Sequence, residues 1–403
     1  MVTTMDLQAN LSRNFQPSAV IAGMIMGMLL ITWADSGTIE PLGIRPVPDA
    51  SRGHDLPEVT PTLETVNPSE TDIPPSTQTL IGVAAQPTSS AGAAAAPVDP
   101  HSVIGSETCV KCHENEVKVW RSTPHHRTFD ELHRRPEAKE IAARLGIRSI
   151  KHDGRCVNCH YTQQVDAGSG NVHAIEGVSC ESCHGAAKRY LDVHHDYGGE
   201  HVTRAMESPQ HRSDRLRRSI ELGMRNPVNV YLVAQSCLRC HTTADEELVN
   251  VGGHSTGSLE FEFVSWSQGT IRHNFVRTDG RQNDPSTLGR LRLMFVSGMI
   301  AELEAGLRAT AIATEKAKYG ITAAQRTDRA AKRLKSVSQK VSSPLLEDIL
   351  SVFSGVKLRL NNEAELKRAA DAIASLGYRF ASDTDPDSLA GIDAYIPPTD
   401  RWK

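Results

Sequence analysis

The sequence repeats one five-residue motif, Cys-x-x-Cys-His, four times between residues 109 and 241. The chain has 8 cysteines, and all of them lie in these motifs: Cys109, Cys112, Cys156, Cys159, Cys180, Cys183, Cys237 and Cys240. Two thiols can add to the vinyl groups of a haem and the following histidine can bind its iron, so the motif is typical of c-type haem attachment. Zinc knuckles and redox dithiols also use paired cysteines, but neither requires a histidine after every pair. The motifs therefore predict four covalently bound haem c groups with the proximal iron ligands His113, His160, His184 and His241.

The composition agrees with a chain that builds part of its interior from cofactors. Its 403 residues leave room for two or three domains. The formal net charge is −4, from 44 basic and 48 acidic residues, which argues against a basic nucleic-acid-binding face. Aromatic residues make up 5% of the chain, which is low for a large core. Four porphyrins would supply the missing apolar surface, so we expect the haem region to be poor in core residues of its own.

The first 104 residues have the character of an export element and a linker. Arg13 precedes an apolar run from Ala19 to Ala34 that only Thr32 interrupts. Residues 1–34 are therefore either a cleaved signal peptide or a membrane anchor, with the tether running through residues 15–34. Residues 35–104 hold 11 of the chain's 21 prolines and predict a disordered Pro/Ser/Thr/Ala-rich linker. Both features, like haem c attachment itself, predict a periplasmic or other extracytoplasmic location.

Two stretches near the motifs have a recognisable pattern. The first motif is followed by Trp120-Arg-Ser-Thr-Pro-His125, and the third lies within Gly177-Val-Ser-Cys-Glu-Ser-Cys-His-Gly185. Over roughly residues 103–245, the sequence resembles the nitrifier tetrahaem cytochrome c family, which accepts electrons from hydroxylamine oxidoreductase. The resemblance implies that His125 is the distal ligand of the third haem, opposite His184. It also implies that His194 is the distal ligand of the first haem, opposite His113.

The sequence departs from that family at the fourth haem. The family places a distal histidine five residues before the fourth motif, where this chain has Leu232. The best substitute is His254, because the two preceding glycines let the backbone approach a porphyrin closely; His273 is the second candidate and Met224 the third. The family also leaves its second haem without a protein sixth ligand. We therefore expect at most one open haem, on His160, unless His173 fills it.

The sequence after the haem motifs changes to helical patterns. Leu259, Phe261 and Phe263 alternate with Glu260 and Glu262, which predicts a short strand over the fourth haem. From Asp284 onward, apolar residues recur at helical spacing, first from Leu288 to Leu307 and next from Ala330 to Val341. Ser343 and Pro344 predict the start of a third helix that runs to Leu360. Asn362 and Glu365 predict the start of a fourth helix, which Gly377 would end.

The predicted architecture is mainly α. Residues 105–283 would form a multihaem cytochrome c domain with loops wrapped around four haems, residues 284–380 a helical bundle, and residues 381–403 a C-terminal tail. The bundle would serve packing or oligomerisation. The favoured function is electron transfer between respiratory redox partner proteins, as a carrier rather than an enzyme. The alternatives are a multihaem reductase or oxidase acting on nitrite, hydroxylamine or nitric oxide at a five-coordinate haem, and a subunit of a larger complex. Iron coordination distinguishes the carrier from the enzyme.

Overall fold

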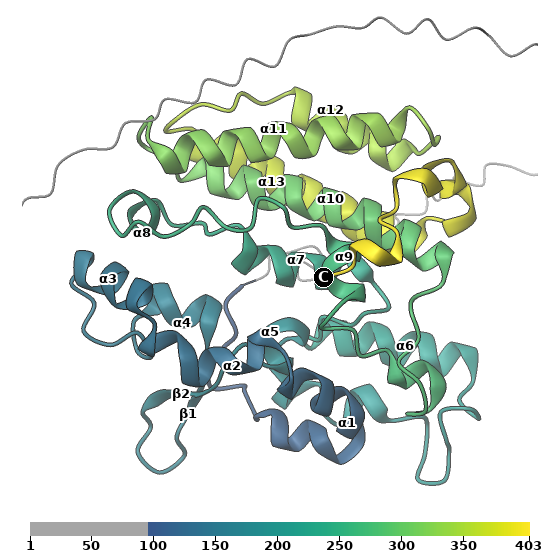
Figure 1. The fold of residues 1–403 in the computed structure, drawn as a ribbon. Helices are drawn as coiled ribbons and strands as arrows, with labels where there is room; N and C mark the ends of the chain where they lie inside the picture. The colour runs from purple at the N-terminus through teal and green to yellow at the C-terminus, as the bar shows by residue number, and fades with distance from the viewer. Residues whose placement is uncertain (1–95) are drawn as a thin grey trace, which may run out of the picture. The chain divides into compact units, whose positions relative to one another are not determined.

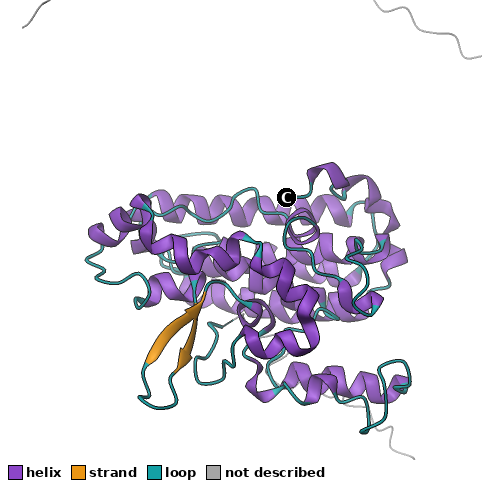
Figure 2. Ribbon diagram, turned by 60° about the horizontal axis from the view of Figure 1, so that its bottom comes forward, coloured by secondary structure: helices purple, strands orange, loops and turns teal. Residues whose placement is uncertain are grey.

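The computed structural model describes residues 96–403, which belong to one compact unit. The predicted export segment and most of the predicted linker lie outside the described residues. The fold is mainly α, as expected, with one small hairpin and a C-terminal helical bundle (Figure 1 and Figure 2). Within residues 96–403, no helix is both long and apolar enough to cross a membrane.

The haem region consists of short helices joined by loops. Its helices are α1 (Ser106–Arg121), α2 (Pro124–Glu131), α3 (Pro136–Arg144), α4 (Gly154–His160), α5 (Cys180–His184), α6 (Pro209–Glu221), α7 (Val230–His241), α8 (Glu246–Asn250) and α9 (Phe263–Gln268). Single 3-10 turns cover Leu132–Arg134, Ala187–Arg189, Val193–His195 and Phe275–Thr278. The strands β1 (Thr162–Val165) and β2 (Val172–Glu176) pair antiparallel, with Gln163 opposite Ala174.

The C-terminal bundle follows the predicted periodicity closely. Its helices are α10 (Leu288–Ala311), α11 (Lys318–Ser338), α12 (Pro344–Ser354) and α13 (Glu363–Asp383), followed by 3-10 turns at Pro386–Tyr395 and Thr399–Arg401. The helix α10 packs against both α11 and α13, which run beside it (Figure 1). Ser343 caps α12 as predicted, because its hydroxyl accepts a hydrogen bond from the Leu346 amide. The third predicted helix ends at Ser354, so Leu360 lies beyond it.

The strand predicted around Phe261 is wrong. No strand forms there: Leu259 and Glu260 make a turn that the Phe261 amide closes on the Ser258 carbonyl, and Phe263 begins α9. The Glu262 carboxylate accepts hydrogen bonds from the amides of Val264 and Ser265, so it caps the helix instead of facing solvent from a strand. Phe261 and Phe263 are both buried in the main core.

The prediction that Gly377 ends the fourth helix is also wrong. The helix α13 continues to Asp383. A Cβ atom at Gly377 would lie 2.5 Å from the Tyr231 ring and 2.9 Å from Ile300 Cγ2. The glycine is therefore required for the close approach of α7 to α13, and not for a left-handed helix end.

The helix α7 belongs to both regions. Tyr231, Ala234 and Leu238 are fully buried in the main core. The Tyr231 hydroxyl donates to Glu304 Oε2 at 2.5 Å, and Gln235 Nε2 donates to the same oxygen at 2.7 Å. Since α7 ends in the fourth Cys-x-x-Cys-His motif, the bundle fixes the position of that motif.

Candidate haem-binding sites

All four motifs are helical in this structure. The first lies in α1, the second and fourth end α4 and α7, and the third is the whole of α5. Residues three and four apart share one face of a helix, so both cysteines and the histidine of a motif can face the same porphyrin. In α1 the backbone leaves the helical conformation at His113, with φ −121° and ψ 40°. The first motif therefore ends at a bend, where the others end at or near a helix terminus.

The helices that carry the motifs contact one another in the order α1, α5, α7, α4. The neighbouring Cys180 thiol raises the pKa of Cys109, and the neighbouring Cys240 thiol raises the pKa of Cys159. Arg239 Nη2, in the fourth motif, donates to the Ser182 carbonyl of the third at 3.3 Å. The spatial order of the motifs is therefore first, third, fourth, second.

Each motif histidine faces a second histidine from elsewhere in the chain. The distances between ring centroids are 6.3 Å for His113–His194, 6.3 Å for His125–His241, 6.2 Å for His160–His254 and 6.1 Å for His184–His273. A metal–imidazole bond is about 2.0 Å long, so two such bonds, with about 1 Å from each nitrogen to its ring centre, span about 6 Å. One metal ion fits between the rings of each pair.

The ring nitrogens of these histidines are also arranged for metal binding. In four of them Nδ1 donates to a backbone carbonyl: His184 to Arg225 (3.3 Å), His194 to Leu191 (2.5 Å), His254 to Ser255 (2.8 Å) and His273 to Ile271 (2.6 Å). A carbonyl oxygen can only accept, so Nδ1 carries the proton and Nε2 keeps its lone pair. This tautomer is the one a metal-bound histidine needs.

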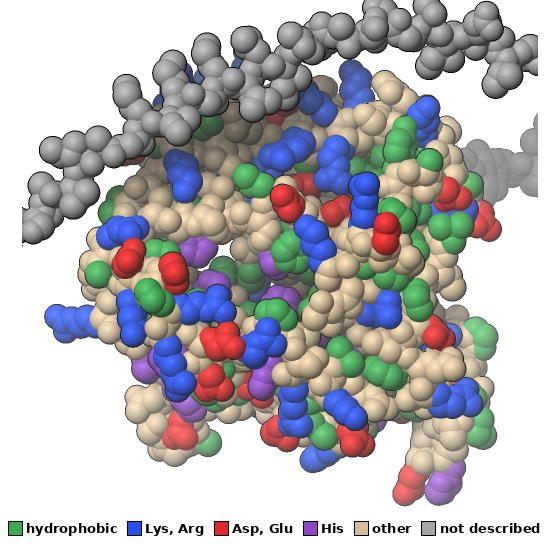
Figure 3. All heavy atoms as spheres, in the orientation of Figure 1, with side chains coloured by type: hydrophobic (Ala, Val, Ile, Leu, Met, Phe, Trp, Pro, Cys, Tyr) green, Lys and Arg blue, Asp and Glu red, His purple; other side chains and the backbone are tan. Residues whose placement is uncertain are grey.

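Partial burial favours the neutral form of several of these imidazoles. It lowers the pKa of His160, His184 and His241 to about 4, and it also lowers the pKa of His125. A neutral imidazole is the form that binds a metal. At the first motif, by contrast, the Glu116 carboxylate, 3.9 Å from Nδ1, raises the pKa of His113. In the space-filling view, histidines gather around a hollow on the face shown (Figure 3). Paired cysteines, facing imidazoles and neutral rings together fit covalently held haem.

The residues that carry the family resemblance form one hydrogen-bonded unit. Trp120 Nε1 donates to the Val178 carbonyl at 2.8 Å, and the Val178 amide donates to the His125 carbonyl at 3.0 Å. A Cβ atom at Gly177 would clash with the same His125 carbonyl, so only glycine allows this approach. Thr123 is extended and caps α2, with Pro124 at its first position. These contacts separate His125 from α1 and lock α2 against the segment before the third motif.

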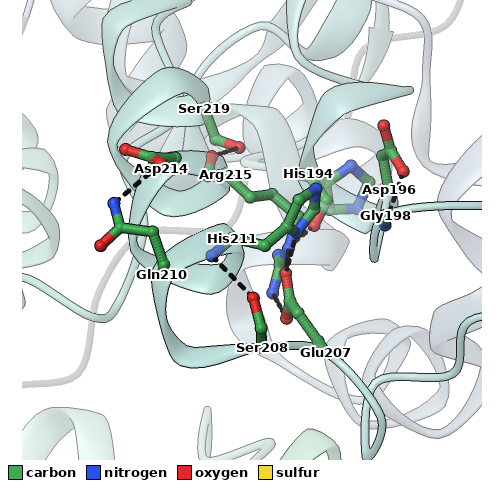
Figure 4. A network of polar contacts seen from close by, with 10 residues as sticks. All are labelled: His194, Asp196, Gly198, Glu207, Ser208, Gln210, His211, Asp214, Arg215 and Ser219. Atoms are coloured by element: carbon green, nitrogen blue, oxygen red, sulfur yellow. Dashed lines mark hydrogen bonds and ion pairs between the residues drawn. The ribbon is translucent and has the colours of Figure 1, made fainter.

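The backbone of His194 is held by a buried ion pair (Figure 4). Arg215 Nη1 donates to the His194 carbonyl at 2.6 Å, while its Nε and Nη2 donate to Glu207 at 2.7 and 2.6 Å. The Glu207 side chain is 1% exposed, and the hydrogen bond from Arg215 lowers its pKa to about 2. His211 Nδ1 also bonds Glu207, at 2.8 Å. The ion pair therefore anchors the turn that presents His194.

The structure places all three predicted distal histidines opposite a motif histidine. His194 faces His113, the pairing that the resemblance implies. His125 faces His241 instead of His184, and His254 faces His160 instead of His241. The reason is the order of the motif helices: α2 and α4 are in contact, and Thr128 Oγ1 donates to the His160 carbonyl, so His125 lies on the side of the second and fourth motifs.

His273, the second candidate for the fourth haem, faces His184. It lies 32 residues beyond the fourth motif, and no local pattern marks it. His173 lies in β2, where it pairs with Gln164 of β1. No sequence feature links His273 to His184, because their contact depends on how distant segments pack.

Comparisons with known proteins cover part of the chain. Residues 108–185 match the family model described as "Cytochrome c554 and c-prime". Over 100 residues, the chain is 28% identical to cytochrome c-554 of Nitrosomonas europaea, which is 23% of this chain and 43% of that protein. The chain thus spans less than half the length of this relative. No solved structure matches. The resemblance to the nitrifier tetrahaem cytochromes is confirmed over the segment that carries the first three attachment motifs.

Proposed function

We propose that this protein is a tetrahaem c-type cytochrome that carries electrons between redox partner proteins outside the cytoplasm. The observation that carries the proposal is the pairing of every motif histidine with a second histidine. A haem with two protein ligands exchanges electrons but offers no open face to a small molecule.

Each haem would be attached through the two cysteines of its motif and held between two imidazoles. The proposed iron ligands are His113 with His194, His160 with His254, His184 with His273, and His241 with His125. The haem supplies reversible one-electron chemistry at its iron. The chain orients four of the imidazoles through Nδ1 hydrogen bonds to backbone carbonyls, and most of the eight rings are partly shielded from water. Such ligation favours low reduction potentials, since an axial methionine would raise them.

The order of the motif helices supports a route for electrons. Electrons would pass between the first, third, fourth and second haems, following the contacts of α1, α5, α7 and α4. At one end of this route Cys112 is exposed, and the His113 side chain is 37% exposed. A redox partner could approach the first haem there, while the third and fourth haems lie in the middle of the chain of motifs.

The alternative function, reduction or oxidation of a small nitrogen compound, needs an iron with an open coordination position. Among the described residues, each of the four motif histidines has a facing partner. This arrangement favours the carrier over the enzyme. Attachment of haem c also supports the proposed extracytoplasmic location.

The test combines haem counting with single replacements of the proposed distal ligands. Haem per polypeptide is measured after denaturation, and spin state by electron paramagnetic resonance. His125→Ala, His194→Ala, His254→Ala and His273→Ala should each keep four haems, because the thioether bonds do not depend on the distal ligand. Each should convert one low-spin haem to high spin.

His195→Ala is the matched control, because His195 neighbours His194 and its Nδ1 also bonds the Leu191 carbonyl. This variant should leave all haems low spin. A count of three or fewer haems contradicts the proposal, as does a control variant that behaves like His194→Ala.

A further inference from the structure

His241 differs from four of the other paired histidines in the partner of its ring. Its Nδ1 lies 2.9 Å from the Ser258 hydroxyl. The corresponding nitrogens of His184, His194, His254 and His273 bond backbone carbonyls. A side-chain hydroxyl can be removed by substitution without moving the backbone, whereas a carbonyl cannot. The hydrogen bond between Ser258 and the His241 ring can therefore be removed by substitution without changing the fold.

The loop that carries Ser258 is held against His241 by a direct hydrogen bond, by Arg326, which bonds both segments, and by a close backbone approach at Gly257. The Ser258 amide donates to the His241 carbonyl at 2.9 Å. Arg326, from α11, donates to that carbonyl at 3.0 Å and to the Ser258 carbonyl at 2.9 Å. Gly257 has a φ of +85°, and a Cβ there would clash with the His241 carbonyl. The position of the hydroxyl relative to the ring is therefore fixed by a residue of the bundle.

Arg326 is itself held inside the bundle by an acidic partner. Its side chain is 2% exposed, and its Nε lies 3.3 Å from Glu302 Oε1 of α10. Glu302 also pairs with Arg333 at 3.1 Å and is 8% exposed. A buried guanidinium needs such a partner, because an unpaired buried charge is strongly destabilising. The contacts run without a gap from α10 through Arg326 and Ser258 to His241.

We propose that Ser258, held by Arg326 and Glu302, is a positioning residue that sets the reduction potential of the haem on the fourth motif. The inference rests on the proposed function, since it requires His241 to bind iron. A hydroxyl that accepts the Nδ1 proton makes the imidazole a stronger donor to the metal. A stronger donor stabilises the oxidised iron more than the reduced iron and lowers the potential. The C-terminal bundle thereby acts on electron transfer as well as on packing.

The location of the fourth motif means that its reduction potential affects electron transfer through the whole protein. It lies third in the spatial order, between the third and second motifs. An electron that crosses the protein from end to end must pass through the fourth haem, so its potential affects flow in both directions.

The test is a spectroelectrochemical titration of the full-length haem-loaded protein. Ser258→Ala should raise one of four midpoint potentials and leave the other three unchanged. The expected shift is about a tenfold change in the oxidised-to-reduced ratio of one haem, or about 59 mV for one electron. Ser258→Thr retains a hydroxyl and should restore the wild-type value.

Ser255→Ala is the matched control. Ser255 binds His254 through its backbone carbonyl, so loss of its hydroxyl should shift no potential. An unshifted Ser258→Ala protein that still has four low-spin haems overturns the inference and leaves the proposed function intact. A wild-type protein with fewer than four haems contradicts the proposed function instead.

Discussion

The two regions of the described chain are stabilised in different ways. The main hydrophobic core takes all of its buried residues from Val230 onward, chiefly from α10, α11 and α13. Before residue 230, four buried apolar residues form a small cluster around α3 and α4, namely Ala142, Ile150, Val157 and Tyr161. Four more, Val103, Val117, Ala187 and Tyr190, are buried outside that cluster. That region instead brings cysteines and histidines together. The bundle therefore has an apolar core of its own, whereas we expect the haem region to need its porphyrins to complete an interior.

The largest expected effect follows from removing the haems. Replacing all eight motif cysteines by serine should leave α1 and α5 without a packed interior, while α10 and α13 keep their core. In hydrogen exchange followed by mass spectrometry, amides of the first group should lose their protection and those of the second should retain it. Undiminished protection of α1 and α5 would show that the haem region is stable without its cofactors.

A smaller effect, a loss of unfolding free energy, is expected from a cavity in the bundle. Leu303 in α10 is fully buried, so Leu303→Ala should lower the free energy of unfolding by about 2–5 kcal/mol. Leu288, in the same helix, is 49% exposed, and Leu288→Ala should change it by less than about 0.5 kcal/mol. Urea denaturation of the haem-loaded proteins, followed by far-ultraviolet circular dichroism, compares the two. Equal losses would mean that α10 is not the centre of the core.

The packing of α7 on α13 can be tested by adding one carbon atom. Gly377→Ala places a methyl group 2.5 Å from the Tyr231 ring, and overpacking of this kind costs about 1–3 kcal/mol. Gly355→Ala is the control, because the nearest atom to its Cβ would be 3.5 Å away and its φ is −79°. Urea denaturation should show a lower free energy of unfolding for Gly377→Ala and an unchanged one for Gly355→Ala. Without that difference, the two regions would not be joined through α7 as described.

The sequence predicted the fold class and the local helix signals better than the contacts between helices. The attachment motifs, the mainly α fold, α10 and the Ser343 cap follow from local patterns that the structure reproduces or that each motif contains. The pairing of His125 with His241, and of His273 with His184, depends on which helices touch. No local pattern encodes those contacts. The predictions of a helix end at Gly377 and of a strand around Phe261 were wrong for the same reason. Tertiary packing, and not the local sequence, determines what surrounds these residues.

The smallest expected effect concerns the ion pair that anchors His194. The bond from Arg215 lowers the pKa of Glu207 from the ordinary 4.5 to about 2. A lowered carboxylate pKa means that the stabilisation is fully present above pH 4.5 and is lost as pH falls towards about 2. In the wild-type protein the first haem should stay low spin above pH 4.5. Below that pH the turn that presents His194 should become less firmly held, and a high-spin fraction should appear.

The variant Glu207→Gln lacks the carboxylate at every pH, so a small high-spin fraction should already appear at pH 6. Absorbance spectra of the oxidised protein across an acid titration measure this fraction. Asp214→Asn is the control, because Asp214 lies on the same helix as Arg215 but pairs with Arg217. If both variants titrate like wild type, the ion pair does not hold His194.

The central claim is that four haem irons are each bound by two histidines. Electron paramagnetic resonance of the oxidised wild-type protein, followed by carbon monoxide titration of the reduced protein, tests it most directly. We expect low-spin signals from four haems, no high-spin ferric signal, and no carbon monoxide bound. A high-spin signal together with one equivalent of bound carbon monoxide would reveal an open haem and contradict the pairing of all four motif histidines.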